Sequence, residues 1–371
     1  MNKVPPYNNS GIFYCHYCNM NYSKIYDYLM TTHSFFPYWL GEGKSFPPAR
    51  IQLELTYRCN LRCAMCYQDK NSVPSTELET GEWIKIIKQL PKVCLITLIG
   101  GEPLIRNDFE EIVNSTSVSQ RCNMVTNGVL LSEHINRFLI ERKFLLVGVS
   151  LDGVDNIHDK MRGVKGTYKK VVFNLNDLQK QKIKKRSKYP LLDIKTVVTS
   201  QNQDNLYELF RKAEELKADF FTISMPKVCV GQFNPKMREE MTKLSSFDFS
   251  LFNGIDFKKV REVLKKIVDT RTKMKIRFYP NLSSIEELGK NLYNPKTIKE
   301  KFFSCYQPWS GVQITAKGDV YPCLSLRMGN IREKSFSEIW NSEKFVIFRK
   351  QLRRQKLFES CLGCCYLSQR K

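Results

Sequence analysis

The stretch Ile51-Gln-Leu-Glu-Leu-Thr-Tyr-Arg-Cys59-Asn-Leu-Arg-Cys63-Ala-Met-Cys66-Tyr67 joins a short apolar strand to three cysteines on one loop. A 4Fe–4S cluster contains four irons, so three thiolates leave one iron open to a further ligand. The loop follows a predicted strand, Ile51–Leu55, and βα enzymes place their active sites at the carboxyl ends of strands. Zinc is the competing metal, but no fourth cysteine or histidine lies close to the triplet in sequence.

Outward from this loop, short apolar strands alternate with amphipathic helices. The predicted strands are Ile51–Leu55, Leu95–Ile99, Asn123–Val125, Leu146–Leu151, Asp193–Val198 and Phe220–Met225, and the predicted helices are Thr80–Leu90, Asp108–Ser115, Ser132–Arg142, Tyr168–Gln181 and Leu206–Leu216. Strands with a helix between each pair imply an α/β fold with a parallel sheet and right-handed crossovers. Both an open sheet and a barrel fit this alternation.

Four regions are expected along the 371 residues. Residues 1–48 form an N-terminal extension, 49–226 the alternating core, 227–304 a connecting region of mixed helices and loops, and 305–371 a short, cysteine-bearing tail with few strands. No apolar run approaches the roughly 18–20 residues that span a bilayer, and residues 1–10 contain no signal-peptide core. We therefore expect a cytoplasmic protein without a membrane partner.

The chain has thirteen cysteines, which in a cytoplasmic protein favour metal ligands or buried thiols over disulfides. Cys94 and Cys122 lie in or beside apolar strand-like runs and are expected to be small buried hydrophobic residues. Cys15 and Cys18 form a Cys-x2-Cys pair that could bind zinc with His33, although a convincing fourth ligand is missing. Two reduced thiols in a loop are an equal alternative there.

The formal net charge of +22 invites a nucleic-acid partner, because lysine and arginine neutralise phosphates. Bound clusters would lower this charge by about three units, since their cysteines are thiolates. Much of the remainder is local, as in the lysine-rich residues 180–188. A solvated basic surface is therefore favoured over a nucleic-acid-binding one.

The Cys-x3-Cys-x2-Cys triplet with the aromatic Tyr67 beside its last cysteine resembles the signature of the radical S-adenosylmethionine (SAM) superfamily. After the second predicted strand, Gly100-Gly101-Glu102-Pro103 matches a segment of that family. The resemblance implies that its backbone and carboxylate receive the ammonium group of SAM. Paired glycines allow close backbone approach, and an acidic side chain suits an ammonium.

Two later segments continue this resemblance. They are Val125-Thr126-Asn127-Gly128 and Ser150-Leu151-Asp152-Gly153, the second followed by His158-Asp159-Lys160-Met161-Arg162-Gly163. The resemblance implies that Asn127 belongs to the SAM site and that Ser150 and Arg162 hold the SAM carboxylate or ribose. For Asp152, a ligand role and a turn-capping role are equal alternatives. For His158, a structural hydrogen bond is favoured over proton donation.

The tail resembles the twitch domain, the short form of the SPASM domain, through Cys305, Cys323, Cys361 and Cys364. In that family these four cysteines hold an auxiliary 4Fe–4S cluster, and full ligation suits electron transfer or fold support. A structural zinc site with four cysteines is the alternative. Cys365 could replace Cys364, but the two-residue spacing favours Cys364.

Taken together, the resemblance implies a partial (β/α)6 TIM-like barrel followed by a small iron–sulfur domain. It implies two 4Fe–4S clusters, SAM as cofactor, and a reductant protein of the flavodoxin or ferredoxin type. The expected enzyme is of the oxidoreductase type: it cleaves SAM reductively to a 5′-deoxyadenosyl radical, removes a substrate hydrogen, and passes an electron to the auxiliary cluster in a dehydrogenation.

The substrate is left open among a small carbohydrate or aminocyclitol, a ribosomal peptide, and a nucleic-acid base. The alternative reactions are peptide cross-linking, peptide epimerisation and base modification. Because residues 1–48 are short for a leader-binding domain, the peptide option is lowered but retained. A non-enzymatic nucleic-acid-binding protein with structural metal sites is the remaining class, and it leaves Gly100–Pro103 unexplained.

Overall fold

The computed structural model describes residues 33–66, 76–226, 252–279, 285, 303–323, 326–358, 361, 364 and 368–369. Its main feature is a ten-stranded sheet in the order β11-β10-β9-β1-β2-β3-β4-β5-β6-β7. The six predicted strands are all present, as β1 (Arg50–Glu54), β2 (Cys94–Ile99), β3 (Gln120–Thr126), β4 (Leu146–Ser150), β5 (Leu191–Val197) and β6 (Phe220–Ser224). Neighbours among these six pair in parallel.

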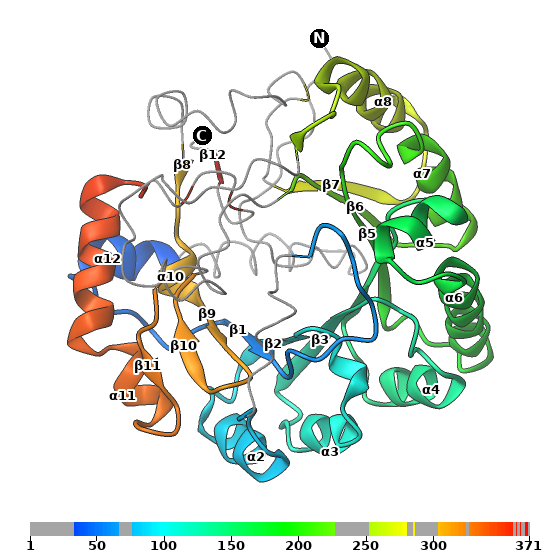
Figure 1. Ribbon diagram of the computed structural model, residues 1–371. Helices are drawn as coiled ribbons and strands as arrows, with labels where there is room; N and C mark the ends of the chain where they lie inside the picture. The colour runs from blue at the N-terminus through cyan, green and yellow to red at the C-terminus, as the bar shows by residue number, and fades with distance from the viewer. Residues whose placement is uncertain are drawn as a thin grey trace.

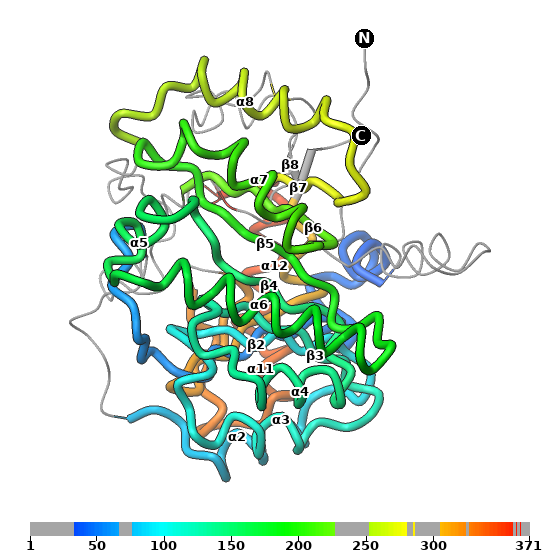
Figure 2. The backbone as a smooth tube through the Cα atoms, turned by 90° about the vertical axis from the view of Figure 1, so that its right-hand side faces the viewer, coloured from blue at the N-terminus to red at the C-terminus, as the bar shows by residue number. Residues whose placement is uncertain are grey.

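The helices cover the outer face of this curved sheet (Figure 1). The five predicted helices appear as α2 (Thr80–Gln89), α3 (Phe109–Asn114), α4 (Glu133–Glu141), α6 (Thr167–Lys184) and α7 (Leu206–Glu215), with α5 (Asn156–Arg162) and the 3-10 turn η1 (Pro103–Ile105) between them. Figure 2 shows α2, α3, α4, α6, α7 and α8 following one another from bottom to top, as expected for a partial barrel. The fold class predicted from the sequence is therefore confirmed.

Helix–sheet packing forms one large hydrophobic core. Strand residues such as Ile51 and Leu53 meet helix residues such as Trp83 and Phe210 in it, all fully buried. Cys94 and Cys122 are buried in the same core, which confirms their assignment as small hydrophobic residues. No helix in the described part of the chain has the length and apolar character needed to cross a membrane.

The sequence analysis expected the alternation of strands and helices to end near residue 226, but the structure continues it by one more helix and strand. Helix α8 (Phe257–Asp269) packs on α7, and β7 (Lys275–Tyr279) pairs in parallel with β6. The strand was missed because its sequence, Lys-Ile-Arg-Phe-Tyr, places charged residues where apolar ones were sought, and all five residues remain partly exposed. The region between residues 227 and 304 thus contributes a seventh parallel strand.

The expectation of a strand-poor tail was also wrong. Strand β9 (Gly311–Ile314) pairs in parallel with β1, and the short strands β10 (Asp319–Tyr321) and β11 (Gly329–Asn330) continue the sheet in antiparallel fashion. The remaining tail elements are α10 (Gln307–Ser310), α11 (Phe336–Trp340), α12 (Glu343–Gln355) and β12 (Ser368–Gln369), which pairs with β8 (Phe303–Ser304) just before the tail. These strands are two to four residues long, too short for an apolar pattern to reveal.

The described part of the N-terminal extension packs against the tail. Residues 33–40 are helical, and the Tyr38 ring lies edge-on to Tyr306 and Trp309 with 4.7 Å between centroids in both pairs. The buried Arg349 of α12 donates a hydrogen bond of 3.1 Å to the Gly43 carbonyl. Cys15 and Cys18 lie outside the described residues, so the proposed zinc knuckle stays a prediction.

Candidate functional site

The cysteine loop follows β1 and is fastened to α5. The amide of Arg62 donates to the Arg162 carbonyl (3.0 Å), and the amide of Ala64 donates to the Met161 carbonyl (3.1 Å). Within the loop, Cys59 and Cys63 are half-buried and Cys66 is exposed. The thiols are therefore accessible on a backbone that the barrel holds in place. Tyr67 lies outside the described residues.

Gly100 and Gly101 lie directly against this loop. Their backbone contacts explain the absence of side chains: a Cβ on Gly100 would lie 2.5 Å from the Thr56 carbonyl oxygen, and one on Gly101 would lie 2.2 Å from that of Arg58. Gly100 also has a φ of +152°, which favours glycine. The two glycines thus bring β2 close to the backbone that precedes Cys59.

Replacing Gly101 by alanine is expected to destabilise the protein by at least about 2 kcal/mol, because the new methyl group overlaps backbone that cannot move freely. The measurement is urea unfolding of the cluster-free, reduced protein. Gly81→Ala is the matched control: a Cβ there meets nothing within 4 Å, and alanine in helix α2 should stabilise slightly. Equal stability of Gly101→Ala and the wild type would contradict the close contact.

Glu102 is fully buried and ties the ends of β2 and β3 together. One carboxylate oxygen accepts hydrogen bonds from the Thr126 hydroxyl (2.7 Å) and the Leu104 amide (3.1 Å), and the other accepts one from the Asn127 amide (2.7 Å). Burial raises the pKa of Glu102 to about 7 despite these bonds. In this structure the carboxylate therefore holds the loops after β2 and β3 in register, and Pro103 starts the turn η1 beside it.

Two polar side chains reach the thiols of the loop. The side-chain nitrogen Nδ2 of Asn127 lies 3.9 Å from Cys59 Sγ and donates a hydrogen bond to Asn60 Oδ1 at 2.8 Å. The guanidinium of Arg162 lies 3.5 Å from Cys63 Sγ. Donors at this distance stabilise thiolates, the form in which cysteine binds metal.

Asp152 holds Arg162 in position. Its buried carboxylate forms an ion pair with the guanidinium, and its other oxygen accepts a hydrogen bond from the Val197 amide (2.9 Å). His158 accepts a hydrogen bond from the Asp152 amide through Nδ1 (3.2 Å), which confirms its structural role. Burial lowers the pKa of His158 to about 4, so it is neutral at pH 7. Ser150 ends β4 beside this group and is partly exposed.

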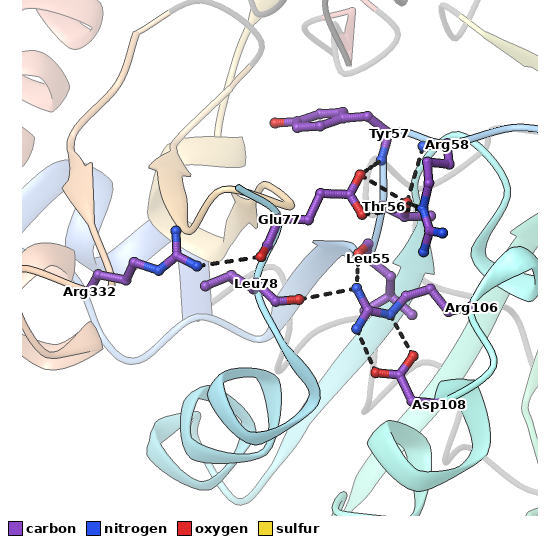
Figure 3. Close-up of polar contacts among 9 residues, drawn as sticks. All are labelled: Leu55, Thr56, Tyr57, Arg58, Glu77, Leu78, Arg106, Asp108 and Arg332. Atoms are coloured by element: carbon purple, nitrogen blue, oxygen red, sulfur yellow. Dashed lines mark hydrogen bonds and ion pairs between the residues drawn. The ribbon is translucent and has the colours of Figure 1, made fainter. Parts of the chain in front are cut away.

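A second polar network fastens the other side of the loop (Figure 3). The Glu77 carboxylate accepts hydrogen bonds from the Thr56 hydroxyl (2.8 Å) and the Tyr57 amide (2.7 Å). Arg106 donates to the carbonyls of Leu55 and Leu78 (3.1 Å each), so the segment before α2 is bound to the end of β1.

This network also joins the tail to the barrel. Arg332, which follows β11, donates to the Glu77 carbonyl (3.5 Å) and forms a salt bridge with Glu82 of α2. The sequence analysis missed Glu77, Arg106 and Arg332, because no local motif marks them. Only folding brings the Arg332 side chain to a residue 255 positions earlier.

The described tail cysteines pack in or against the main hydrophobic core. Cys305 is buried in it, and Cys323, Cys361 and Cys364 are half-buried against it. The Cys364 amide donates to the Cys361 carbonyl (3.1 Å), so these two residues share a tight turn. Cys365 lies outside the described residues. The alternative between Cys364 and Cys365 therefore stays open.

The donor set fits iron–sulfur clusters. Each site offers thiols without carboxylates or imidazoles among its predicted ligands, and sulfur is the ligand of such clusters. In the described part of the chain, no three Cys, His, Asp or Glu side chains converge on a point where a single metal ion would sit. A cubane does not require such convergence, because each of its thiolates binds a different iron.

Comparisons with known proteins agree with this site. Residues 53–220 match the radical SAM superfamily, and residues 305–365 match an iron–sulfur cluster-binding domain of the SPASM type. The chain is 28% identical over 328 residues to an AdoMet-dependent heme synthase of Methanosarcina barkeri. This alignment covers 86% of this chain and 89% of the relative. It is 29% identical over 311 residues to a cysteine-type anaerobic sulfatase-maturating enzyme of Clostridium novyi, with 76% of each covered.

Solved structures show the same fold. The crystal structure of SuiB from Streptococcus suis superposes with a TM-score of 0.62 at 16% identity and covers 94% of this chain and 77% of that one. The structure of native anSMEcpe with bound AdoMet and the Cp18Cys peptide superposes with a TM-score of 0.57 at 21% identity and covers 86% of this chain and 88% of that one. The two matched domains show that the chain contains a radical SAM domain over residues 53–220, followed by a SPASM-type iron–sulfur cluster-binding domain over residues 305–365.

Proposed function

We propose that the protein cleaves SAM reductively and uses the resulting 5′-deoxyadenosyl radical to remove a hydrogen atom from a substrate. The observation that carries the proposal is the cysteine loop itself. Cys59, Cys63 and Cys66 lie on a backbone held by β2 on one side and α5 on the other. Asn127 and Arg162 place polar donors beside two of the thiols. Such a loop would hold a cluster with one open iron, which is where SAM would bind.

The chain's own residues would bind and orient SAM around that loop. We assign the ammonium to the backbone of Gly100 and Gly101, which is partly exposed, while the buried Glu102 keeps that backbone in place. Arg162, oriented by Asp152, would face the carboxylate of SAM, because a guanidinium binds a carboxylate through two parallel hydrogen bonds. Ser150, at the end of β4, would face the carboxylate or the ribose.

The four tail cysteines would hold an auxiliary 4Fe–4S cluster, giving two clusters in all. Its full ligation leaves electron transfer or fold support as its roles, and we propose a dehydrogenation in which this cluster accepts an electron. A flavodoxin- or ferredoxin-type protein would supply the electron that starts each turnover. A second candidate, the modification of a peptide, is favoured by the structural neighbour SuiB, which was solved with its precursor peptide SuiA.

The test is turnover of SAM without a substrate. Reconstituted anaerobically with iron and sulfide and reduced with dithionite, the wild-type protein is expected to form 5′-deoxyadenosine and methionine. Both products are measured by chromatography and mass spectrometry. Binding of SAM without any cleavage, in a protein with its full iron content, would overturn the proposal.

A further inference from the structure

Strand β5 carries two charged residues on the concave face of the sheet. Successive residues of a strand point to opposite faces. Leu192 and Ile194 pack with Phe210 of α7 in the main core, on the helix-covered side. Asp193 and Lys195 therefore point the other way, into the interior of the partial barrel.

These residues belong to a charged cluster built from three neighbouring strands. The fully buried Asp193 carboxylate accepts a hydrogen bond from the Thr222 hydroxyl (2.6 Å) and pairs with Lys195 Nζ (2.9 Å) and Arg277 Nη2 (2.6 Å). The Lys195 side chain is 26% exposed and that of Arg277 is 11% exposed. One carboxylate is thus shared by two cations, both of which reach the surface of the interior.

The register of the sheet places this cluster beside the SAM site. Lys195 on β5 is paired with Ser150 on β4 and with Thr222 on β6. Thr222 is in turn paired with Arg277 on β7. These four residues therefore form one row across the concave face. Ser150 is the residue that we assign to SAM, so the cationic groups follow directly beyond it.

The interior is shaped to keep Lys195 in this row. Gly148, below Ser150 on β4, lies under the lysine stem: a Cβ there would be 2.7 Å from Lys195 Cε. Leu146, Leu191 and Phe220 form a separate apolar cluster at the opposite end of β4 to β6. The lysine stem thus leans back over Gly148 to Asp193, and the ammonium group lies between this apolar cluster and the carboxyl ends of the strands, where the cysteine loop lies.

We propose that Lys195, with Arg277 beside it, binds a carboxylate or phosphate group of the substrate next to the SAM site. The inference rests on the proposed function and adds the class of substrate, which is an acidic molecule. Lys195 shares the Asp193 carboxylate with Arg277 and is partly exposed, so its ammonium group keeps attraction for a further anion, and this attraction is strong where water is partly excluded.

The test uses Lys195→Met in the reconstituted holoenzyme. Methionine keeps an unbranched stem over Gly148 and leaves Asp193 paired with Arg277, so the fold should survive. Thermal unfolding is followed at rising concentrations of succinate or inorganic phosphate, with sodium chloride at matched ionic strength as reference. Lys195→Arg should retain the effect, and Lys169→Met, on the exposed side of α6, is the control.

We expect one of the two anions to raise the unfolding temperature of the wild type, Lys195→Arg and Lys169→Met beyond the chloride reference. In Lys195→Met the apparent Kd for that anion should be at least about tenfold higher, because one charge-assisted hydrogen bond is lost. The anion that acts distinguishes a carboxylate from a phosphate substrate.

Equal anion effects in the wild type and Lys195→Met, or none in the wild type, would overturn the inference, because a purely structural lysine would change stability without changing anion binding. Formation of 5′-deoxyadenosine is measured in the same samples. Lys195-dependent anion binding without SAM cleavage would leave the anion site standing and refute the proposed function instead.

Discussion

Replacing Cys59, Cys63 and Cys66 together by alanine is expected to reduce 5′-deoxyadenosine formation to the rate of the reagents without protein. The three thiols share one loop, and the other described cysteines cannot replace them. Cys94 and Cys122 are buried in the core, and the described tail cysteines are buried in it or packed against it. Without the proposed cluster no electron would reach SAM, although Gly100, Gly101 and Arg162, to which we assign SAM binding, would remain.

The control for this experiment is the double variant Cys94→Ala and Cys122→Ala, which changes two thiols outside the site. It should cleave SAM at the wild-type rate, with a loss of stability of about 1–2 kcal/mol from two small cavities. Circular dichroism of the triple variant should match that of the wild type, since the loop backbone is held by amides of Arg62 and Ala64. Undiminished cleavage in the triple variant would contradict the assignment of these cysteines.

Cys323→Ala is expected to halve the iron content, which allows the roles of the two proposed clusters to be measured separately. Two cubanes predict about eight irons per chain, and the loss of one leaves about four. Cleavage of SAM without substrate should continue, because Cys323 follows β10 and contributes nothing to the loop after β1. If the auxiliary cluster accepts the substrate electron, formation of the oxidised product should stop.

Fold support gives a different result for the same variant. Losing a metal site removes several kcal/mol of folding free energy or more, so the variant would unfold at lower urea, while its folded fraction would still make normal product. A folded Cys323→Ala protein that lacks the second cluster and forms product at the wild-type rate would rule out the electron-acceptor role. Four irons with one zinc in the wild type would instead make the tail a zinc site.

Much of the barrel could be predicted from the sequence, because its first six strands are short runs rich in buried apolar residues and are separated by amphipathic helices. Strand β7 could not, since Lys275 and Arg277 interrupt its apolar pattern to face the barrel interior. Strand β9 could not either, because a four-residue strand shows no period. Its place beside β1 depends on the return of the chain from β7 to the first strand of the sheet.

The sequence by itself determined the superfamily and its predicted metal ligands, because Cys59, Cys63 and Cys66 are spaced on one loop where local chain geometry sets their arrangement. The tertiary structure decided what surrounds them. It buries Glu102 under the strand ends, places Arg162 beside Cys63 through Asp152, and brings Lys195 next to Arg277. Those contacts join residues that are far apart in the chain, and they exist only once the order and register of the strands are formed.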